Sequence, residues 1–367
     1  MIDRHELGAW LRLLETPQLG RDSARKLLCA FGSPQAVIDA PTRARLEVVG
    51  PTQATALATP PDGIDALVAA TFAWLEADAP EPRAAIALGD PRYPRALLDS
   101  ADPPVLLYAQ GRFDLLQAGS IAVVGSRNPT PQGSDNARAF SHHLSDAGLT
   151  IVSGMALGID AAAHAGGLEG PGSTIAVVGT GLDRVYPRRN LNLAHRIAGN
   201  GLIVSEYSLG TPALAAHFPL RNRIIAGLAS GTLVVEAALQ SGSLITARLA
   251  NEAGRDVFAI PGSIHSPQSR GCHALIKQGA KLVETAQDIL EELRLPDAST
   301  HIAPPAEPDT EEDPLLAALG FEPVTLDALG ARTGRTASEL STRLLGLELE
   351  GRVARLPGQL FQRVVRR

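Results

Sequence analysis

Glycine, serine and arginine recur directly after short apolar segments, in a pattern suited to binding an anion. Three such groups are Gly125-Ser126-Arg127, Ser153-Gly154 and Ser241-Gly242-Ser243. Glycine lets a backbone N–H approach a phosphate oxygen closely, and the N-terminus of a following helix attracts negative charge. We therefore predict that these turns form a phosphate-binding edge.

Two further groups add arginine and asparagine to this set, at Arg188-Arg189-Asn190 and Arg221-Asn222-Arg223. The stretch 181–227 holds six arginines and two acidic residues, a local charge of +4 in a chain of net charge −6. The planar, permanently charged guanidinium group matches phosphate geometry. This pattern favours an anionic ligand. The alternative is that some of these arginines pair structurally with Asp183 or Glu206.

The common signatures of nucleotide-dependent enzymes are missing. Gly125 is not followed by the further glycines of a GxGxxG motif, and the chain has no GxxxxGK[ST] motif. Asp160 and His164 stand four residues apart without an obvious third metal ligand, so we expect them to be structural. A site rich in hydrogen-bond donors for an anion and poor in general bases predicts binding without catalysis. We also expect no metal and no cofactor.

Six short apolar segments, separated by helix-length stretches, bring these turns together. Because the segments are continuously apolar, both faces should be buried, as in a parallel sheet covered by helices on each side. Ligands of such sheets bind at the carboxyl ends of the strands. We predict a doubly wound, Rossmann-like α/β domain over residues 116–295. The segments are 121–124, 150–152, 174–178, 202–204, 232–235 and 256–260.

Residues 1–80 are predicted to form a small helical domain of the SAM or helix-hairpin-helix type. Leu7, Trp10, Leu11 and Leu14 follow helical spacing. Glycines at positions 20 and 50 precede expected helix starts, where their backbone amides could meet a DNA phosphate. Plain helical packing explains the same pattern, so both interpretations stay open.

Three further parts complete the expected organisation. Residues 81–115 are proline-rich and are interpreted as a connector, and residues 296–313 as an acidic linker without lysine or arginine. Residues 314–367 combine a capping box at Thr336 with a hairpin signal at Pro357-Gly358. Helices followed by a hairpin predict a winged-helix-like domain.

Composition limits the class of protein. The chain has 367 residues, of which 45% are hydrophobic and 20% charged, which indicates a globular protein of two to three domains. The acidic balance means that any nucleic-acid surface is a local patch. Cys29 and Cys272 are expected to be buried, reduced thiols. No run of 18 apolar residues and no signal peptide stands out, so we expect a cytoplasmic protein with no membrane contact.

Several motifs together resemble the DNA-processing protein A family, also called DprA or Smf. The similarity covers about 180 residues of the α/β domain and is highly specific. Thr180 replaces a frequent cysteine of the family, and Pro131-Gln132 precedes Gly133 where an aromatic residue often stands. The matching stretches are 125–127, 153–164, 181–187, 205–207, 218–227, 235–237, 241–247, 254–262 and 271–276.

This resemblance implies a single-stranded-DNA-binding protein of natural transformation and recombination. Such proteins protect incoming DNA, help a RecA-type recombinase to load and act as homodimers without being enzymes. The family's binding residue carries over onto Arg127 and, less directly, onto Arg188. Leu275, Ile276 and the segment after Pro261 offer apolar surface for self-association.

Two other classes of protein remain as alternatives. A nucleotide phosphoribohydrolase of related fold would carry PGGxGTxxE, but residues 229–235 lack the two leading glycines and place Val235 at the glutamate position. A protein-interaction scaffold with a vestigial α/β site is the other possibility. Release of free base from nucleoside monophosphates would identify the enzyme.

Overall fold

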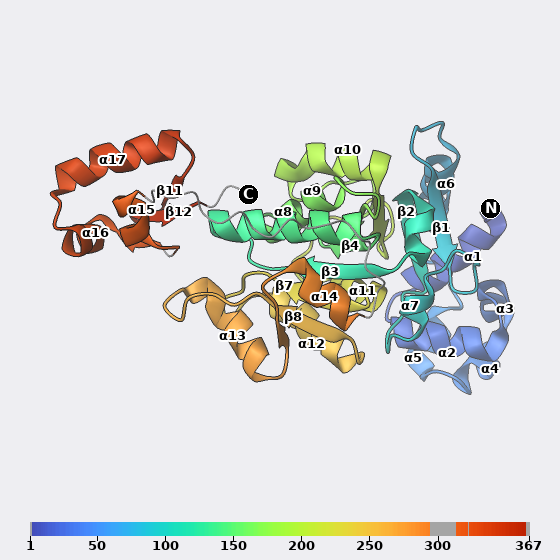
Figure 1. Ribbon diagram of the computed structural model, residues 1–367. Coiled ribbons are helices and arrows are strands. Elements are labelled where there is room, and N and C mark those ends of the chain that lie inside the picture. Colours follow the sequence, from blue (N-terminus) through green and yellow to red (C-terminus); the bar gives the residue numbers. More distant parts are fainter. Residues whose placement is uncertain (1, 294–312, 322, 365–367) are drawn as a thin grey trace.

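A nine-stranded sheet in the order β1-β2-β6-β5-β4-β3-β7-β8-β9 forms the centre of the computed structural model, which describes residues 2–293, 313–321 and 323–364 (Figure 1). From β6 to β9 neighbouring strands are parallel. The strand order reverses between β3 and β7, which marks the place where doubly wound sheets bind ligands. The parallel strands are β3 (Ser120–Val124), β4 (Thr150–Ser153), β5 (Thr174–Val177), β6 (Leu202–Ser205), β7 (Gly231–Val234), β8 (Asp256–Ala259) and β9 (Lys281–Leu282).

Helices cover both faces of this sheet, so the predicted doubly wound fold is confirmed. In β3, Ile121 and Val123 face one side, and Ala122 and Val124 face the other. The first side packs against α8 (Pro131–Asp146), α9 (Ile159–Gly167) and α14 (Ala286–Glu292). The second packs against α11 (His217–Leu228), α12 (Ser243–Glu252) and α13 (Arg270–Lys277). Helix α10 (Leu191–Asn200) packs beside β5, and the 3₁₀ turns are η1 (Phe113–Gln117), η2 (Arg188–Asn190) and η3 (Pro267–Ser269).

The proline-rich segment 81–115 belongs to the sheet and is not the connector that we expected. It forms β1 (Arg83–Ala87), α7 (Arg95–Leu98) and β2 (Leu106–Gly111), and β2 pairs antiparallel with β6. Leu107 and Ala109 face the α/β core, whereas Leu106 and Tyr108 face the N-terminal helices. The two strands are buried on both sides, and they join the N-terminal helices to the α/β domain.

The N-terminal helices are α1 (Arg4–Glu15), α2 (Arg21–Phe31), α3 (Pro34–Asp39), α4 (Thr42–Leu46), α5 (Pro51–Ala56) and α6 (Ile64–Glu76). Helix α1 buries Leu7, Trp10 and Leu11 as its spacing predicts, and it buries Leu13 more fully than Leu14. Helices α2 and α5 begin directly after Gly20 and Gly50.

The C-terminal domain has the predicted arrangement of helices and a hairpin, and its three strands follow the order β10-β12-β11. Its helix α17 begins with the capping box that Thr336 and Glu339 form. The elements are α15 (Pro314–Leu319), β10 (Val324–Thr325), α16 (Leu326–Thr333), α17 (Ala337–Leu349), β11 (Val353–Leu356) and β12 (Leu360–Arg363).

The predicted linker 296–313 lies outside the described residues except for Asp313. Neither cysteine forms a disulfide, but only Cys272 is buried, whereas Cys29 is exposed and its predicted burial is wrong. Across the described ranges, no helix has the length and apolar character needed to span a membrane.

Candidate nucleic-acid interface

A cleft of about 730 Å³ lies at the carboxyl ends of β3 and β7, where the strand order reverses. The turns after these strands and the side of α11 line it. Of the fourteen residues predicted for the site, eight line this cleft: Gly125, Ser126, Arg127, Arg221, Asn222, Ser241, Gly242 and Ser243. The structure therefore brings eight of the predicted residues together at one cleft, and the other six lie outside its lining.

Arg127 places an exposed cation at this cleft. Its guanidinium carbon lies 5.9 Å from the centroid of the Phe218 ring. Tyr186 also lines the cleft, is 52% exposed, and packs at 5.5 Å between ring centroids against Phe218. Arg127 has no acidic partner within the described ranges. A guanidinium over the Phe218 ring, which itself packs on Tyr186, can contact a phosphate while the rings contact an adjoining base.

Phe218 and Tyr186 belong to the cleft but were not among the predicted site residues. Phe218 stands three residues before Arg221 on α11, and this spacing places two side chains on one face of a helix. That spacing was the available signal for Phe218. Tyr186 offered only its proximity in sequence to Arg188.

Arg221 is buried beneath the cleft together with Asp160. Its Nη1 donates a hydrogen bond to the Val177 carbonyl at 2.5 Å. Burial lowers the pKa of Arg221 to about 10, so the group stays charged at neutral pH. Burial raises the pKa of the Asp160 carboxyl, although the Arg221 charge opposes that shift.

Gly154 makes room for Arg221 and does not offer its amide to a ligand. A Cβ at this position would lie 1.9 Å from Nη1 of Arg221. The amides of Gly154 and Ala156 both donate to Oδ2 of Asp160 at 3.2 Å. The phosphate contact predicted for the Gly154 amide is therefore replaced by a contact within the chain.

The first helix after β3 has an anion of its own at its N-terminus. The carboxylate of Glu236 accepts from the Thr130 amide at 2.9 Å and from the Thr130 hydroxyl at 2.5 Å. Gly133 leaves space for this carboxylate, because a Cβ there would meet its Cδ at 2.3 Å. Burial raises the pKa of Glu236. The N-terminus of α8, where a ligand phosphate was expected, is thus already occupied.

Helix α12 contributes the other helix N-terminus at this edge. Gly242 precedes its first residue, Ser243, and both residues line the cleft. The hydroxyl oxygens of Ser241 and Ser243 lie 2.7 Å apart, and the Asn222 amide donates to the Gly242 carbonyl at 3.4 Å. This turn therefore presents hydroxyl groups and the positive end of a helix to the cleft.

Ser153 and Asn190 hold the backbone of the site in place. The Ser153 hydroxyl donates to the Val123 carbonyl at 2.7 Å. The Asn190 amide donates to the carbonyls of Met155 and Ala156 at 2.8 and 3.1 Å. Both side chains are buried, and their hydrogen-bond donors are already used by these contacts within the chain.

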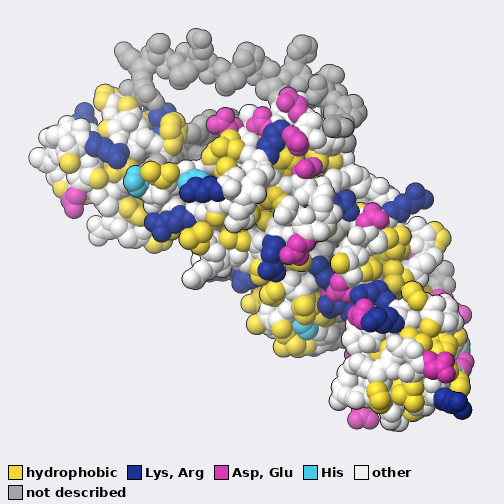
Figure 2. All heavy atoms as spheres, turned by 90° about the horizontal axis from the view of Figure 1, so that it is seen from below, with side chains coloured by type: hydrophobic (Ala, Val, Ile, Leu, Met, Phe, Trp, Pro, Cys, Tyr) yellow, Lys and Arg dark blue, Asp and Glu magenta, His cyan; other side chains and the backbone are white. Residues whose placement is uncertain are grey.

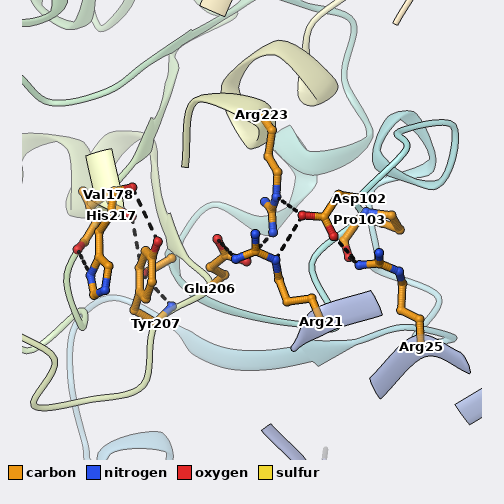
Figure 3. Close-up of polar contacts among 11 residues, drawn as sticks. Arg21, Arg25, Asp102, Pro103, Val178, Glu206, Tyr207, His217 and Arg223 are labelled. Carbon is orange, nitrogen blue, oxygen red and sulfur yellow. Dashed lines mark hydrogen bonds and ion pairs between the residues drawn. The ribbon is translucent and has the colours of Figure 1, made fainter. Parts of the chain in front are cut away.

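The remaining predicted cations differ in their surroundings. Arg188 and Arg189 are exposed on η2, two and three residues after Tyr186. Arg223 does not line the cleft but pairs with Asp102 and Glu206 (Figure 3). The alternative interpretation, in which some arginines pair with acidic residues, is therefore correct for Arg223.

His164 is structural as expected, with its Nδ1 at 2.7 Å from the Thr174 hydroxyl and its Nε2 accepting from the Met155 amide at 3.3 Å. Burial lowers the pKa of His164 to about 3, so the ring is neutral.

The face seen in Figure 2 intersperses basic and acidic side chains, without one large field of either sign. On the face that this view shows, any attraction for an anion therefore depends on local groups of charges.

A helical N-terminal domain, a doubly wound sheet with a cleft at its reversal point that Arg127 lines, and a C-terminal domain of helices and a hairpin define an α/β protein of three-part architecture. The family model described as DNA recombination-mediator protein A matches residues 84–294, and the DprA winged helix domain matches residues 299–359. The chain belongs to this DprA/Smf family, as its motifs predict.

Named relatives extend the similarity over the chain. Protein Smf of Escherichia coli K12 is 41% identical over 365 residues, which cover 95% of this chain and 94% of the relative. DNA processing protein DprA of Streptococcus pneumoniae R6 is 52% identical over 203 residues, covering 55% of this chain and 72% of the relative.

Two solved structures agree in fold. The X-ray structure of DprA from Streptococcus pneumoniae gives a TM-score of 0.69 at 39% identity and covers 78% of this chain and 97% of that one. DNA processing protein A from Helicobacter pylori gives 0.53 at 31% identity and covers 58% of this chain and 95% of that one. The description of the latter concerns its mode of binding single-stranded DNA.

Proposed function

We propose that this protein binds single-stranded DNA in the cleft between the β3 and β7 turns. The observation that carries the proposal is Arg127, an exposed cation without an acidic partner in the described chain, placed over the Phe218 ring. The binding of single-stranded DNA by the relative from Helicobacter pylori supports it.

The aromatic side chains favour a single strand over a duplex. Phe218 and Tyr186 can stack only on a base whose face is open, and the bases of a duplex are already stacked on one another. Arg221 adds a buried charge, and its Nε has no hydrogen-bond partner in the described ranges. An oxygen of a phosphate or a base in the cleft would satisfy that group.

Family membership supports the wider role that we propose. The protein acts without catalysis in natural transformation and recombination, where it protects incoming DNA and helps a RecA-type recombinase to load. The described residues carry no three-residue group of His, Cys, Asp and Glu that could hold a metal ion. We assign no surface to the recombinase.

Binding measurements test the DNA assignment directly. Labelled oligo-dT and a duplex of equal length are titrated into the full chain, and nucleoside monophosphates are incubated with it in parallel. We expect tight, salt-dependent binding of oligo-dT, weaker binding of the duplex and no release of free base. Absence of oligo-dT binding would refute the assignment, and release of free base would favour a phosphoribohydrolase.

We also propose that the chain forms a homodimer through the surface around α12, β8 and α13. A hollow of about 630 Å³ lies there, and Leu275 lines it. Leu239 also lines it and is 59% exposed, and Leu282 on the neighbouring strand is 45% exposed. Apolar side chains that surround a hollow offer a surface for a second copy.

Light scattering at micromolar concentration tests this dimer. We expect a dimer for the natural chain and a monomer for Leu239→Arg. Leu46→Arg, which changes another exposed leucine on α4, is the matched control and should stay dimeric. A monomeric natural chain, or a Leu239→Arg variant that remains dimeric, would disprove the proposed surface.

A further inference from the structure

Two carboxylates join the N-terminal helix α2 to helix α11 of the α/β domain (Figure 3). Asp102 accepts from Nε of Arg21 at 3.0 Å, from Nε of Arg223 at 2.8 Å, and from Nη1 of Arg25. Glu206 accepts from Nη2 of Arg223 at 2.5 Å and lies 3.6 Å from Nη1 of Arg21. Side chains from three separate parts of the chain thus meet in one network.

The burial of this network indicates what it contributes. The side chains of Glu206 and Arg223 are only 6% and 10% exposed. Removing charges from water costs about as much free energy as their pairing returns, so buried ion pairs add little net stability. Their geometry is nevertheless strict, because breaking one pair leaves a buried charge without a partner. The network therefore serves to fix positions.

The position that it fixes is that of α11. This helix carries Arg223 into the network and presents Phe218, Arg221 and Asn222 to the cleft. A second contact begins next to Glu206, where the Tyr207 ring stacks on His217, the first residue of α11, at 4.0 Å between ring centroids. Movement of Asp102 or Glu206 would therefore move the wall of the cleft.

We propose that Arg21 and Arg25 of the N-terminal domain are positioning residues for the DNA cleft, acting through Asp102, Glu206 and Arg223 on α11. This inference rests on the proposed binding of single-stranded DNA. The N-terminal domain then adjusts the affinity of a cleft to whose lining its described residues do not contribute.

Asp102→Asn is a test in which long-range electrostatics and the positioning role predict opposite changes in DNA affinity. Removing a negative charge near a cationic cleft should strengthen DNA binding if only long-range electrostatics matter. The positioning role predicts weaker binding, by about fivefold or more, which is the usual lower range for coupling between sites. Asp114→Asn removes an exposed carboxylate elsewhere and is the matched control, whose affinity should not fall.

Hydrogen exchange of residues 217–228 without DNA supplies an independent measurement. We expect faster exchange of α11 in Asp102→Asn and no change in Asp114→Asn. Unchanged or tighter oligo-dT binding by Asp102→Asn, or unchanged exchange of α11, would overturn the inference. If the natural chain bound no oligo-dT, the proposed function would fail, while the exchange experiment would still report whether Asp102 restrains α11.

Arg25→Ala separates positioning from direct contact with DNA, and its place at the edge of the network limits the damage to folding. Positioning predicts weaker oligo-dT binding with an unchanged salt slope. A direct phosphate contact would instead flatten the slope by about 0.7. That flattening, or an unchanged affinity, would contradict the role assigned to Arg25.

Discussion

Replacing Arg127 by alanine tests the proposed cleft at its most exposed cation. Arg127 and Arg221 line the cleft, and the exposed Arg188 and Arg189 follow its lining residue Tyr186 by two and three residues. Four phosphate contacts to a single strand give a salt slope of about −2.8, so affinity should fall about fifty-fold between about 50 and 200 mM salt. Loss of one contact should flatten that slope to about −2.1. A charged hydrogen bond of about 1.5 kcal/mol corresponds to about tenfold in affinity.

Folding should be almost unaffected by this change. Arg127 is exposed, and within the described ranges its recorded side-chain contact is the one with the Phe218 ring. An exposed cation–π pair contributes about 0.5–1 kcal/mol, so the melting temperature should fall by about 2 °C. Arg127→Ala should therefore separate binding from stability.

The assay is a titration of labelled oligo-dT at several salt concentrations, with a thermal melt of each protein. Arg112→Ala removes an exposed arginine that pairs with Asp114 outside the cleft, and it should keep the natural affinity and slope. Unchanged binding by Arg127→Ala would refute the reasoning. A large drop in melting temperature with binding intact would show that Arg127 is structural.

Three further predictions concern the tail, a glycine and a buried histidine. Deleting residues 314–367 should lower oligo-dT affinity by less than about tenfold in the same titration, because α17 carries one arginine, Arg343, which pairs with Asp313, and its Glu339 and Glu348 repel phosphate. Gly154→Ala should cost about 1–3 kcal/mol in urea unfolding and weaken oligo-dT binding, because its methyl group displaces the Arg221 guanidinium. Gly199→Ala, which has open space at its Cβ and lies in α10, should not destabilise the protein and should leave binding unchanged. The pKa of His164 is lowered from 6.5 to about 3, so the unfolded chain binds a proton more readily than the folded one. The free energy of unfolding should therefore fall as the pH drops below 6.5, by up to about 1.4 kcal/mol per pH unit. Urea unfolding at pH 7 and pH 5 should show a smaller decrease in this free energy for His164→Gln than for the natural chain.

The sequence was sufficient to predict six of the seven parallel strands, β3 to β8, because each is a continuous apolar segment bounded by turn residues. It missed β9, whose two residues, Lys281 and Leu282, are both exposed and form no apolar segment. The same signal was too weak for β1, where alanine at positions 84, 85 and 87 has low strand propensity. Prolines at 91, 94, 103 and 104 lie in the turns between β1 and β2 and gave the segment the composition of a connector. Its strand character depends on burial between two packed layers, which local composition does not encode.

The candidate site was predictable to the level of its turns but not of its side-chain directions. Arg221 and Arg223 are two residues apart on α11, which turns them by about 200° around the helix axis. One therefore reaches the cleft and the other reaches Asp102, 121 residues away in sequence. To predict which arginine faces the cleft, one must know how α11 is rotated about its axis relative to the sheet. That rotation depends on tertiary packing.

The Glu236 carboxylate at the start of α8 has a consequence for competition by metabolites. In dinucleotide-binding sheets, the corresponding helix N-terminus receives the pyrophosphate of a diffusing cofactor. Here the occupying anion is tethered to the chain, and a tethered group has an effective concentration in the millimolar range or above. A free nucleotide gains little at that position, whereas Arg127 and the N-terminal residue of α12, Ser243, both line the cleft. For the proposed binding of DNA, this arrangement favours the polymer over the monomers from which it is made.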